Sequence, residues 1–251
     1  MLVTALFTVY TTLFVVTAPY GRHAAGAGPR WGFLVNPRVA WAVMESPNLW
    51  WCLYFCLANG GMRAAGGAAL PAANRALVFM FAGHYVNRAL VYPLRLSGGS
   101  KDMPVTVMLS ATFYCTWNGY IQAKYLFDIA TYPTSTHLNS PSFLLGTVVF
   151  FLGFCINYHS DHVMRTLRKP GETGYKIPRG GLFELVSAAN FFGEIVEWAG
   201  FGLAGGYPGK VFALFTFCNT APRGVAHHKW YLEKFGDTYP KERKAVIPFI
   251  W

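Results

Sequence analysis

The 251-residue chain has little charge, and it has especially few acidic residues. Only 13% of its residues are charged, whereas an ordinary soluble domain has about 25%. Asp and Glu number 11 against 21 Lys and Arg, which gives a net charge of +10, and 53% of the residues are apolar. So few charges do not suit a soluble domain, and the composition therefore predicts a protein embedded in a lipid bilayer.

The chain also lacks the cysteine patterns of disulfide-rich and zinc-binding proteins. Its five cysteines lie in apolar segments, and no two of them form a C-x-x-C pair. Cys52 and Cys56 share one helix face four residues apart, which is too far along the axis for a disulfide. We therefore interpret the cysteines as small buried hydrophobic residues.

The usual nucleotide-binding loops are missing as well. No G-x-G-x-x-G follows a predicted strand, and no G-x-x-x-x-G-K-[ST] occurs. The segment Gly205–Lys210 (GGYPGK) has the wrong spacing and no hydroxyl residue after it. Any nucleotide must therefore be held by side chains between helices.

Long apolar runs are what the chain has in abundance, and they predict an all-α fold. A membrane-spanning helix needs about 20 mostly apolar residues. Seven segments qualify, and they form one domain over residues 1–251: approximately 2–18, 42–60, 73–94, 103–127, 142–164, 183–204 and 209–230. The first could instead be a signal peptide, but no basic residue precedes it and no clear cleavage site follows.

The distribution of Lys and Arg predicts how this bundle of seven transmembrane helices is oriented. With the N-terminus outside and the C-terminus in the cytosol, the outer loops hold four of the 21 basic residues, namely Arg63, Arg75, Lys124 and Lys210, which leaves 17 inside. Such an excess is typical of cytoplasmic loops. Because these residues lie between apolar segments and form no continuous arm, we expect no nucleic-acid partner.

Polar residues recur at helical spacing inside the later spans, which is costly in a membrane and therefore points to function. Four groups of residues each share one face of their helix. The groups are Asn157, Asp161, Arg165 and Arg168; Asn190, Glu194 and Glu197; Arg223, His227 and Tyr231; and Tyr85 with Arg88. Single residues of this kind can simply pair to hold helices together. Four stripes at one level favour a polar cavity, and the mixture of cations, amides and carboxylates suits a dinucleotide phosphate. Lys101, Lys169, Lys176 and Arg179 add positive charge nearby.

A metal ion fits these residues less well than a dinucleotide. His159, Asp161 and His162 do not share one helix face, and His227 and His228 point apart. We therefore expect no metal site.

Three long motifs resemble the steroid 5α-reductase family. They are NYHSDHVMRTLRKPGETGYKIPRGGLFELVSAANFFG at Asn157–Gly193, FGDTYPKERKAVIPFIW at Phe235–Trp251 and NGYIQAKYL at Asn118–Leu126. The resemblance covers nearly the whole chain and is strongest after residue 83. It implies a seven-helix membrane enzyme that uses NADPH to reduce the C4–C5 double bond of a 3-oxo-4-ene steroid.

The resemblance also implies roles for individual residues. The NADPH site would come mainly from residues 83–251, and the substrate side would include residues 1–60. Cofactor contacts would be Tyr20, Trp41, Arg88, Lys101, Asn157, Asp161, Arg168, Lys176, Asn190, Glu194, Arg223, His227 and Tyr231. Glu45 and Tyr85 would polarise the substrate carbonyl.

The chemistry of an enone explains why Glu45 and Tyr85 are suited to that role. Hydride adds to the β-carbon and charge develops on the carbonyl oxygen, which then needs hydrogen-bond donors. Tyr85 can donate its phenolic proton, and Glu45 can donate when it is protonated. Without the resemblance, we would interpret Glu45 as a residue near a helix end whose side chain extends toward the membrane–water interface. Met44 stands where the family often has Gln.

Other interpretations of the sequence stay open. A related lipid reductase acting on an enoyl-CoA, a polyprenol or a plant-type sterol enone would share the NADPH site. A membrane methyltransferase using S-adenosylmethionine would also bind its cofactor between helices, and a transporter or receptor would use charged residues for ion passage. We expect a monomer among membrane lipids, in the endoplasmic reticulum of a eukaryote or the inner membrane of a bacterium.

Overall fold

The computed structural model describes residue 23 and residues 29–96, 100–169, 172 and 174–251. Within these ranges the fold is dominated by helices, as expected. The α-helices are α2 (Pro37–Ala58), α3 (Ala72–Val86), α4 (Tyr92–Arg95), α5 (Val105–Lys124), α6 (Thr134–His137), α7 (Pro141–Thr166), α8 (Ala189–Gly205) and α9 (Tyr207–Phe235). Short 3₁₀ turns cover Pro29–Trp31, Gly181–Glu184 and Gly236–Thr238, and π-helical turns cover Asn87–Val91 and Tyr125–Ile129.

Local sequence explains where the longest helices begin. Asn36 accepts a hydrogen bond from the backbone N–H of Arg38 at 3.0 Å, and Pro37 occupies the first turn of α2. Ser140 caps α7 in the same way, accepting from the N–H of Phe143 at 3.2 Å, before Pro141. Both starts therefore satisfy an otherwise free backbone donor and use proline where its missing N–H costs nothing.

Six of the seven predicted spans correspond to helices, with two differences. The π-helical turn at Asn87–Val91 joins α3 to α4, and another extends α5. The sixth span was expected from residue 183, which is wrong, because α8 starts at Ala189. The backbone before it pairs with the C-terminal tail instead: Ser187 N–H donates to Lys244 O at 2.9 Å and Ala188 N–H to Ala245 O at 3.1 Å. The first predicted span, 2–18, lies outside the described residues.

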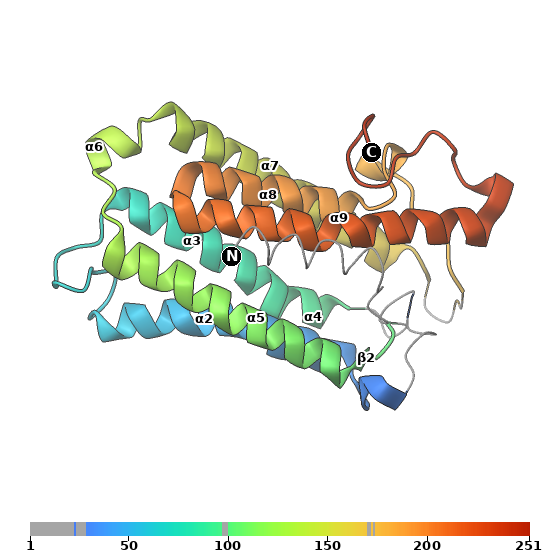
Figure 1. Cartoon of the computed structure of the whole chain (residues 1–251), viewed down its shortest axis with the longest axis horizontal. Coiled ribbons are helices and arrows are strands. Elements are labelled where there is room, and N and C mark those ends of the chain that lie inside the picture. Colours follow the sequence, from blue (N-terminus) through green and yellow to red (C-terminus); the bar gives the residue numbers. More distant parts are fainter. Residues whose placement is uncertain (1–22, 24–28, 97–99, 170–171, 173) are drawn as a thin grey trace.

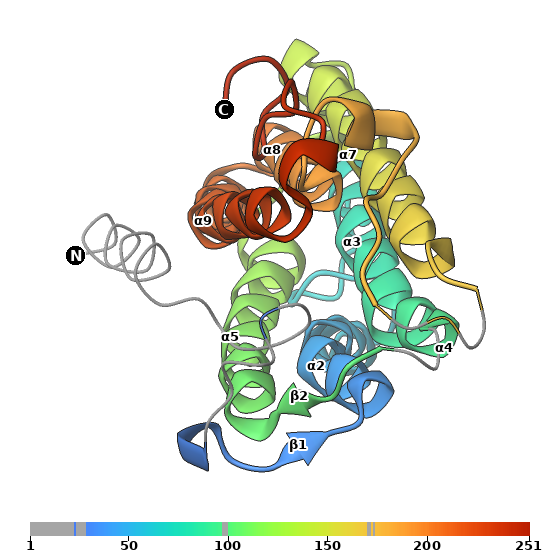
Figure 2. The same cartoon turned by 90° about the vertical axis from the view of Figure 1, so that its right-hand side faces the viewer.

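The described part of the chain also contains a two-stranded sheet, which an all-helical fold would not have. Strand β1 (Leu34–Val35) pairs antiparallel with β2 (Met103–Pro104), with Leu34 opposite Pro104. The pairing ties the start of α2 to the start of α5. These two helices then run side by side along the bundle (Figures 1 and 2).

The long helices lie roughly parallel, with α2, α3 and α5 on one side and α7, α8 and α9 on the other (Figure 2). A shared core of buried aromatic residues, including Phe81, Phe150, Trp198 and Phe212, fills the space between them. Residues Arg63, Arg75, Lys124 and Lys210 lie where α2 and α5 end and α3 and α9 begin, so they gather at one end of the bundle. Which end faces the cytosol stays a prediction.

Glycine lets the backbones of α7 and α8 approach each other closely. Gly146 and Gly153 on α7 and Gly193 and Gly200 on α8 each face the backbone of the other helix. A Cβ atom built on Gly146 would lie 2.7 Å from the carbonyl oxygen of Gly200. Small residues at seven-residue spacing let helix backbones approach closely, as in membrane helix pairs.

Outward-facing apolar side chains are common on these helices. Phe79, Phe113, Trp117, Leu144 and Val148 are 53–75% exposed. Among the described helices, only α7 is both long enough and apolar enough to cross a membrane by length and composition alone. It has 26 residues and a mean hydropathy of 1.6. The exposed apolar faces agree with a lipid environment, and the count of seven spans stays a prediction.

Candidate functional site

A polar cavity of about 260 Å³ lies at the end of the bundle where α4 and α7 end and α8 begins. Ten of the thirteen residues expected to contact a cofactor line it: Trp41, Arg88, Lys101, Asp161, Arg168, Lys176, Asn190, Arg223, His227 and Tyr231. They come from α2, the π-helical turn before α4, α7, α8, α9 and the segments before α5 and α8. Seven of the ten belong to the stripes that helical spacing predicted, and the other three are Trp41, Lys101 and Lys176. The role of all ten as cofactor contacts stays a prediction.

The three remaining residues differ in position. Asn157 is 1% exposed, and its amide nitrogen donates to the backbone carbonyl of Asn190 at 2.9 Å, so it links α7 to α8 behind the cavity. Glu194 faces Arg88 from α8, with 4.0 Å between Oε2 and Nη2. Tyr20 lies outside the described residues.

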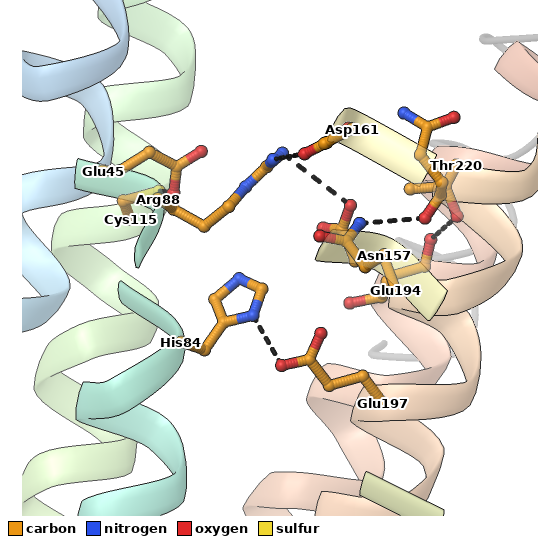
Figure 3. Close-up of polar contacts among 11 residues, drawn as sticks. Glu45, His84, Arg88, Cys115, Asn157, Asp161, Glu194, Glu197 and Thr220 are labelled. Carbon is orange, nitrogen blue, oxygen red and sulfur yellow. Dashed lines mark hydrogen bonds and ion pairs between the residues drawn. The ribbon is translucent and has the colours of Figure 1, made fainter. Parts of the chain in front are cut away.

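Arg88 is the central cation of this region. Its guanidinium is 2.8 Å from the carboxylate of Asp161 (Figure 3). It also lies over the rings of Trp41 at 4.6 Å and Tyr92 at 4.9 Å. Burial of a charge is tolerated when it is paired and hydrogen-bonded. Two carboxylates and two aromatic faces therefore fix this guanidinium at the wall of the cavity.

Aromatic side chains that sequence analysis did not select also line the cavity. Tyr92 and Tyr175 both contribute to the wall, and Phe191 packs against the guanidinium of Arg223 at 4.9 Å. Tyr92 could have been found from the sequence, because it follows Arg88 by four residues on the same helix face. Tyr175 and Phe191 carried no comparable signal.

The segment before α8 and the C-terminal tail are joined by a hydrogen-bond network between the buried Arg243 and the exposed Glu184. Arg243 is 2% exposed and donates to Pro178 O at 2.9 Å and to Glu184 Oε2 at 3.2 Å. The carboxylate of Glu184 also accepts from the N–H of Gly180 at 2.6 Å. This backbone hydrogen bond, followed by the charge of Arg243, holds the pKa of Glu184 below its ordinary value.

Glu45 and Tyr85 lie outside the lining of this cavity, on the helices across from Asp161. Glu45 is half-buried on α2, with Cys115 Sγ of α5 at 3.7 Å from Oε2. Figure 3 shows Arg88 extending between the Glu45 side and Asp161. Tyr85 is 4% exposed and packs against Phe81 and Trp198, with ring centroids 4.8 and 5.8 Å away. An acid and a phenol therefore lie in an apolar setting on the other side of Arg88.

Met44, which precedes Glu45, makes no polar contribution in this structure. It is 5% exposed and belongs to an apolar cluster with Ala40 and Met103. The polar neighbour of the Glu45 carboxyl is instead the thiol of Cys115.

The described part of the chain is thus an apolar helical bundle with cationic and aromatic side chains around a cavity, and with a half-buried acid and a buried phenol on the other side of Arg88. The sequence profile of the family described as 3-oxo-5-alpha-steroid 4-dehydrogenase matches residues 101–251. The chain is 48% identical over 246 residues to 3-oxo-5-alpha-steroid 4-dehydrogenase 1 of Bos taurus, covering 96% of this chain and 91% of that protein. It is 49% identical over 237 residues to the protein of the same name from Rattus norvegicus, covering 94% and 87%.

A plant protein is also similar. Steroid 5-alpha-reductase DET2 of Gossypium hirsutum is 42% identical over 246 residues, covering 96% of this chain and 92% of that protein. The chain belongs to the 3-oxo-5-alpha-steroid 4-dehydrogenase family. It is accordingly an enzyme of the oxidoreductase class.

Proposed function

We propose that this enzyme reduces the C4–C5 double bond of 3-oxo-4-ene steroids with NADPH, forming 5α-3-oxosteroids inside a membrane. The observation that carries the proposal is a cavity whose lining includes Lys101, Arg168, Lys176 and Arg223, with the half-buried Glu45 and the buried Tyr85 on the other side of Arg88. The names of the relatives support the steroid as the substrate class.

The residues around the cavity suit NADPH. Its phosphates need cations and hydrogen-bond donors, which the four basic residues and the amide of Asn190 supply. Its flat rings suit aromatic faces such as Trp41 and Tyr92. When bound there, NADPH supplies the hydride.

The protein's own part in the reaction is to polarise the enone. In the proposed mechanism Glu45 and Tyr85 donate hydrogen bonds to the C3 carbonyl oxygen, where negative charge develops as C5 receives hydride. Donors in a buried, water-poor site stabilise such charge more than donors in water. One proton is then added at C4, so each turnover consumes one hydride and one proton.

A related reductase of another enone lipid is the alternative that an observation favours. The plant relative is nearly as similar as the mammalian ones, at 42% against 48% identity. Met44 is buried in an apolar cluster instead of offering a side-chain amide beside Glu45. The position of Met44 concerns the substrate side, and the alternative uses the same NADPH site.

The proposal extends to the setting of the enzyme. We infer an integral membrane monomer of one domain, with seven spans and a cytosolic C-terminus, in the endoplasmic reticulum or a bacterial inner membrane. The outward apolar faces support the membrane setting. The orientation is supported by Arg63, Arg75, Lys124 and Lys210, the four basic residues assigned to the outside, which lie together at the end opposite the cavity.

The experiment compares purified enzyme in lipid nanodiscs with NADPH or NADH and with testosterone, progesterone or a plant-type 3-oxo-4-ene sterol. The proposal predicts steroid-dependent oxidation of NADPH and a product heavier by two hydrogens. Tight NADPH binding with turnover of the plant-type sterol, and none of testosterone or progesterone, would favour the alternative. A folded sample that fails to bind NADPH would refute both.

A further inference from the structure

The C-terminal tail over residues 236–251 packs against the helix that forms one wall of the cavity, and the proposed chemistry gives this tail no part. Figure 1 shows the tail turning back at the end of α9 and returning alongside that helix. Three residues of α9 that share one face, Arg223, His227 and Tyr231, line the cavity. Each of the three is in contact with the tail or with the segment before α8, either directly or through the residue that follows it.

The first contact lies beside Arg223. Val246 of the tail is 0% exposed, and a Cβ atom built on Gly224 would overlap the Cγ2 of this valine. The same Cβ would lie 3.2 Å from the Cβ of Ala188, which precedes α8. Glycine at position 224 therefore lets the tail reach the backbone of α9 immediately after a residue of the cavity wall.

The second contact is the ring of Tyr231 itself. The rings of Tyr231 and Tyr239 are stacked, with 10° between their planes and 5.2 Å between their centroids. Both residues are buried, at 2% and 1% exposed. Tyr231 lines the cavity and Tyr239 does not, so a ring of the tail supports a residue of the wall from outside the cavity.

A buried serine links the tail to the third cavity residue. Ser187 Oγ is 2.6 Å from the hydroxyl of Tyr239 and 2.6 Å from Nδ1 of His228, which follows His227 on α9. Ser187 is 2% exposed, and its backbone N–H donates to Lys244 O of the tail at 2.9 Å. One residue thus ties the segment before α8, α9 and the tail together.

The hydrogens of this junction define a chain. A serine hydroxyl has one hydrogen, so Ser187 donates to one partner and accepts from the other. One order uses both hydroxyl hydrogens: Tyr239 donates to Ser187, and Ser187 donates to an Nδ1 of His228 that carries no proton. Each hydrogen bond in a buried chain strengthens the next, and a buried polar group left unpaired is destabilising. Removing the Ser187 hydroxyl therefore deprives Tyr239 and His228 of a partner together.

We propose that Ser187 and Tyr239 are positioning residues for NADPH. Neither lines the cavity, and both act by holding the three cavity residues of α9 in the arrangement that binds the cofactor. This inference rests on the proposed function, because it requires NADPH in the cavity. Coupling between two sites is reciprocal, so the docked tail strengthens NADPH binding and bound NADPH stabilises the docked tail.

The test uses two variants in lipid nanodiscs. Tyr239→Phe keeps the stacked ring and removes one hydroxyl, and Ser187→Ala removes the junction. Each should raise the NADPH dissociation constant about 10-fold, which is within the usual range for coupled sites, as measured by fluorescence titration. At saturating NADPH, kcat for a 3-oxo-4-ene steroid should be unchanged, because only binding is weakened. The double variant should bind NADPH no more weakly than Ser187→Ala, since both changes break the same chain.

Hydrogen exchange provides a readout that a loss of stability alone would not change. NADPH should slow exchange over residues 240–251 in the unmodified enzyme and should slow it less in both variants. Tyr132→Phe is the matched control, because the Tyr132 hydroxyl donates to Gly205 O at 2.6 Å near the other end of the bundle. It should lower the melting temperature, as Tyr239→Phe should, and leave the NADPH dissociation constant unchanged.

The outcomes are distinguishable. If Tyr239→Phe and Ser187→Ala bind NADPH as tightly as the unmodified enzyme, or if NADPH does not slow exchange of the tail, the positioning role is overturned while the reductase function stands. If the folded, unmodified enzyme does not bind NADPH, the proposed function fails and this inference fails with it.

Discussion

Replacing Gly193 by alanine should push α7 away from α8 and displace the site residues of the two helices relative to each other. A Cβ atom at this position would lie 2.9 Å from Asn157 Cα and 2.9 Å from Ile156 Cγ2, and the backbone nitrogen of Asn157 is closer still. An ordinary contact begins at 3.4 Å, so α7 must move by at least 0.5 Å, the difference between 3.4 and 2.9 Å. Overpacking of this kind costs about 1–3 kcal/mol.

The same displacement should weaken catalysis, because Asn157 and Asp161 move with α7 while Asn190 and Glu194 stay on α8. Misplacement of about 1 Å can cost on the order of 100-fold in rate. We expect Gly193→Ala to lower the melting temperature and the affinity for NADPH, measured by thermal unfolding and by fluorescence titration in nanodiscs.

Gly83→Ala provides the control for this experiment. A Cβ on Gly83 would meet nothing within 4 Å, and the residue lies inside α3. Alanine there should stabilise the helix by about 0.5–1 kcal/mol. If Gly193→Ala matched this control in melting temperature and NADPH affinity, the close packing of α7 and α8 would not be what positions the site.

Three further predictions concern the site and the tail. Glu45→Gln and Tyr85→Phe should each lower steroid turnover by about 100-fold or more, the cost of one oxyanion donor, while NADPH titrations stay unchanged; full activity of Glu45→Gln would refute its proton-donor role. Arg223→Ala should raise the dissociation constant for NADPH, and an unchanged titration would remove it from the cofactor site. Because the folded-state pKa of Glu184 is depressed, its contribution to stability is present above its ordinary value of 4.5 and is lost as pH falls through the folded value. Hydrogen exchange of the tail over residues 240–251 should therefore accelerate at acid pH, and Glu184→Gln should show fast exchange at every pH.

Long apolar runs were sufficient to predict the helices, and helical spacing was sufficient to predict part of the cavity lining. Asp161 lies on α7, with Arg168 at helical spacing from it just past the end of that helix, and Arg223, His227 and Tyr231 lie on α9, so their common faces were visible in the sequence. The start of α8 was not, because the backbone at 185–188 is determined by hydrogen bonds to a tail 57 to 59 positions away, from Ser187 to Lys244 and from Leu185 to Lys244. Pairing of that kind depends on the tertiary fold and leaves no local pattern.

The roles of individual polar residues were harder to predict than their positions. Asn157 and Glu194 lie on the expected faces, yet one bridges two helices and the other faces Arg88. The sequence placed Glu197 on the same stripe but could not show that it meets His84, since the partners are 113 positions apart. The glycines of α7 and α8 explain the convergence, and their seven-residue spacing acquires meaning only when the two helices are known to touch.

The most direct test of the account is transfer of deuterium from NADPH labelled at the hydride position of its nicotinamide to a 3-oxo-4-ene steroid. We expect one deuterium at C5 of the product, on the 5α face, and one solvent-derived proton at C4, resolved by mass spectrometry and NMR. Deuterium at another carbon, or a saturated product with none, would contradict the reduction that we propose for this enzyme.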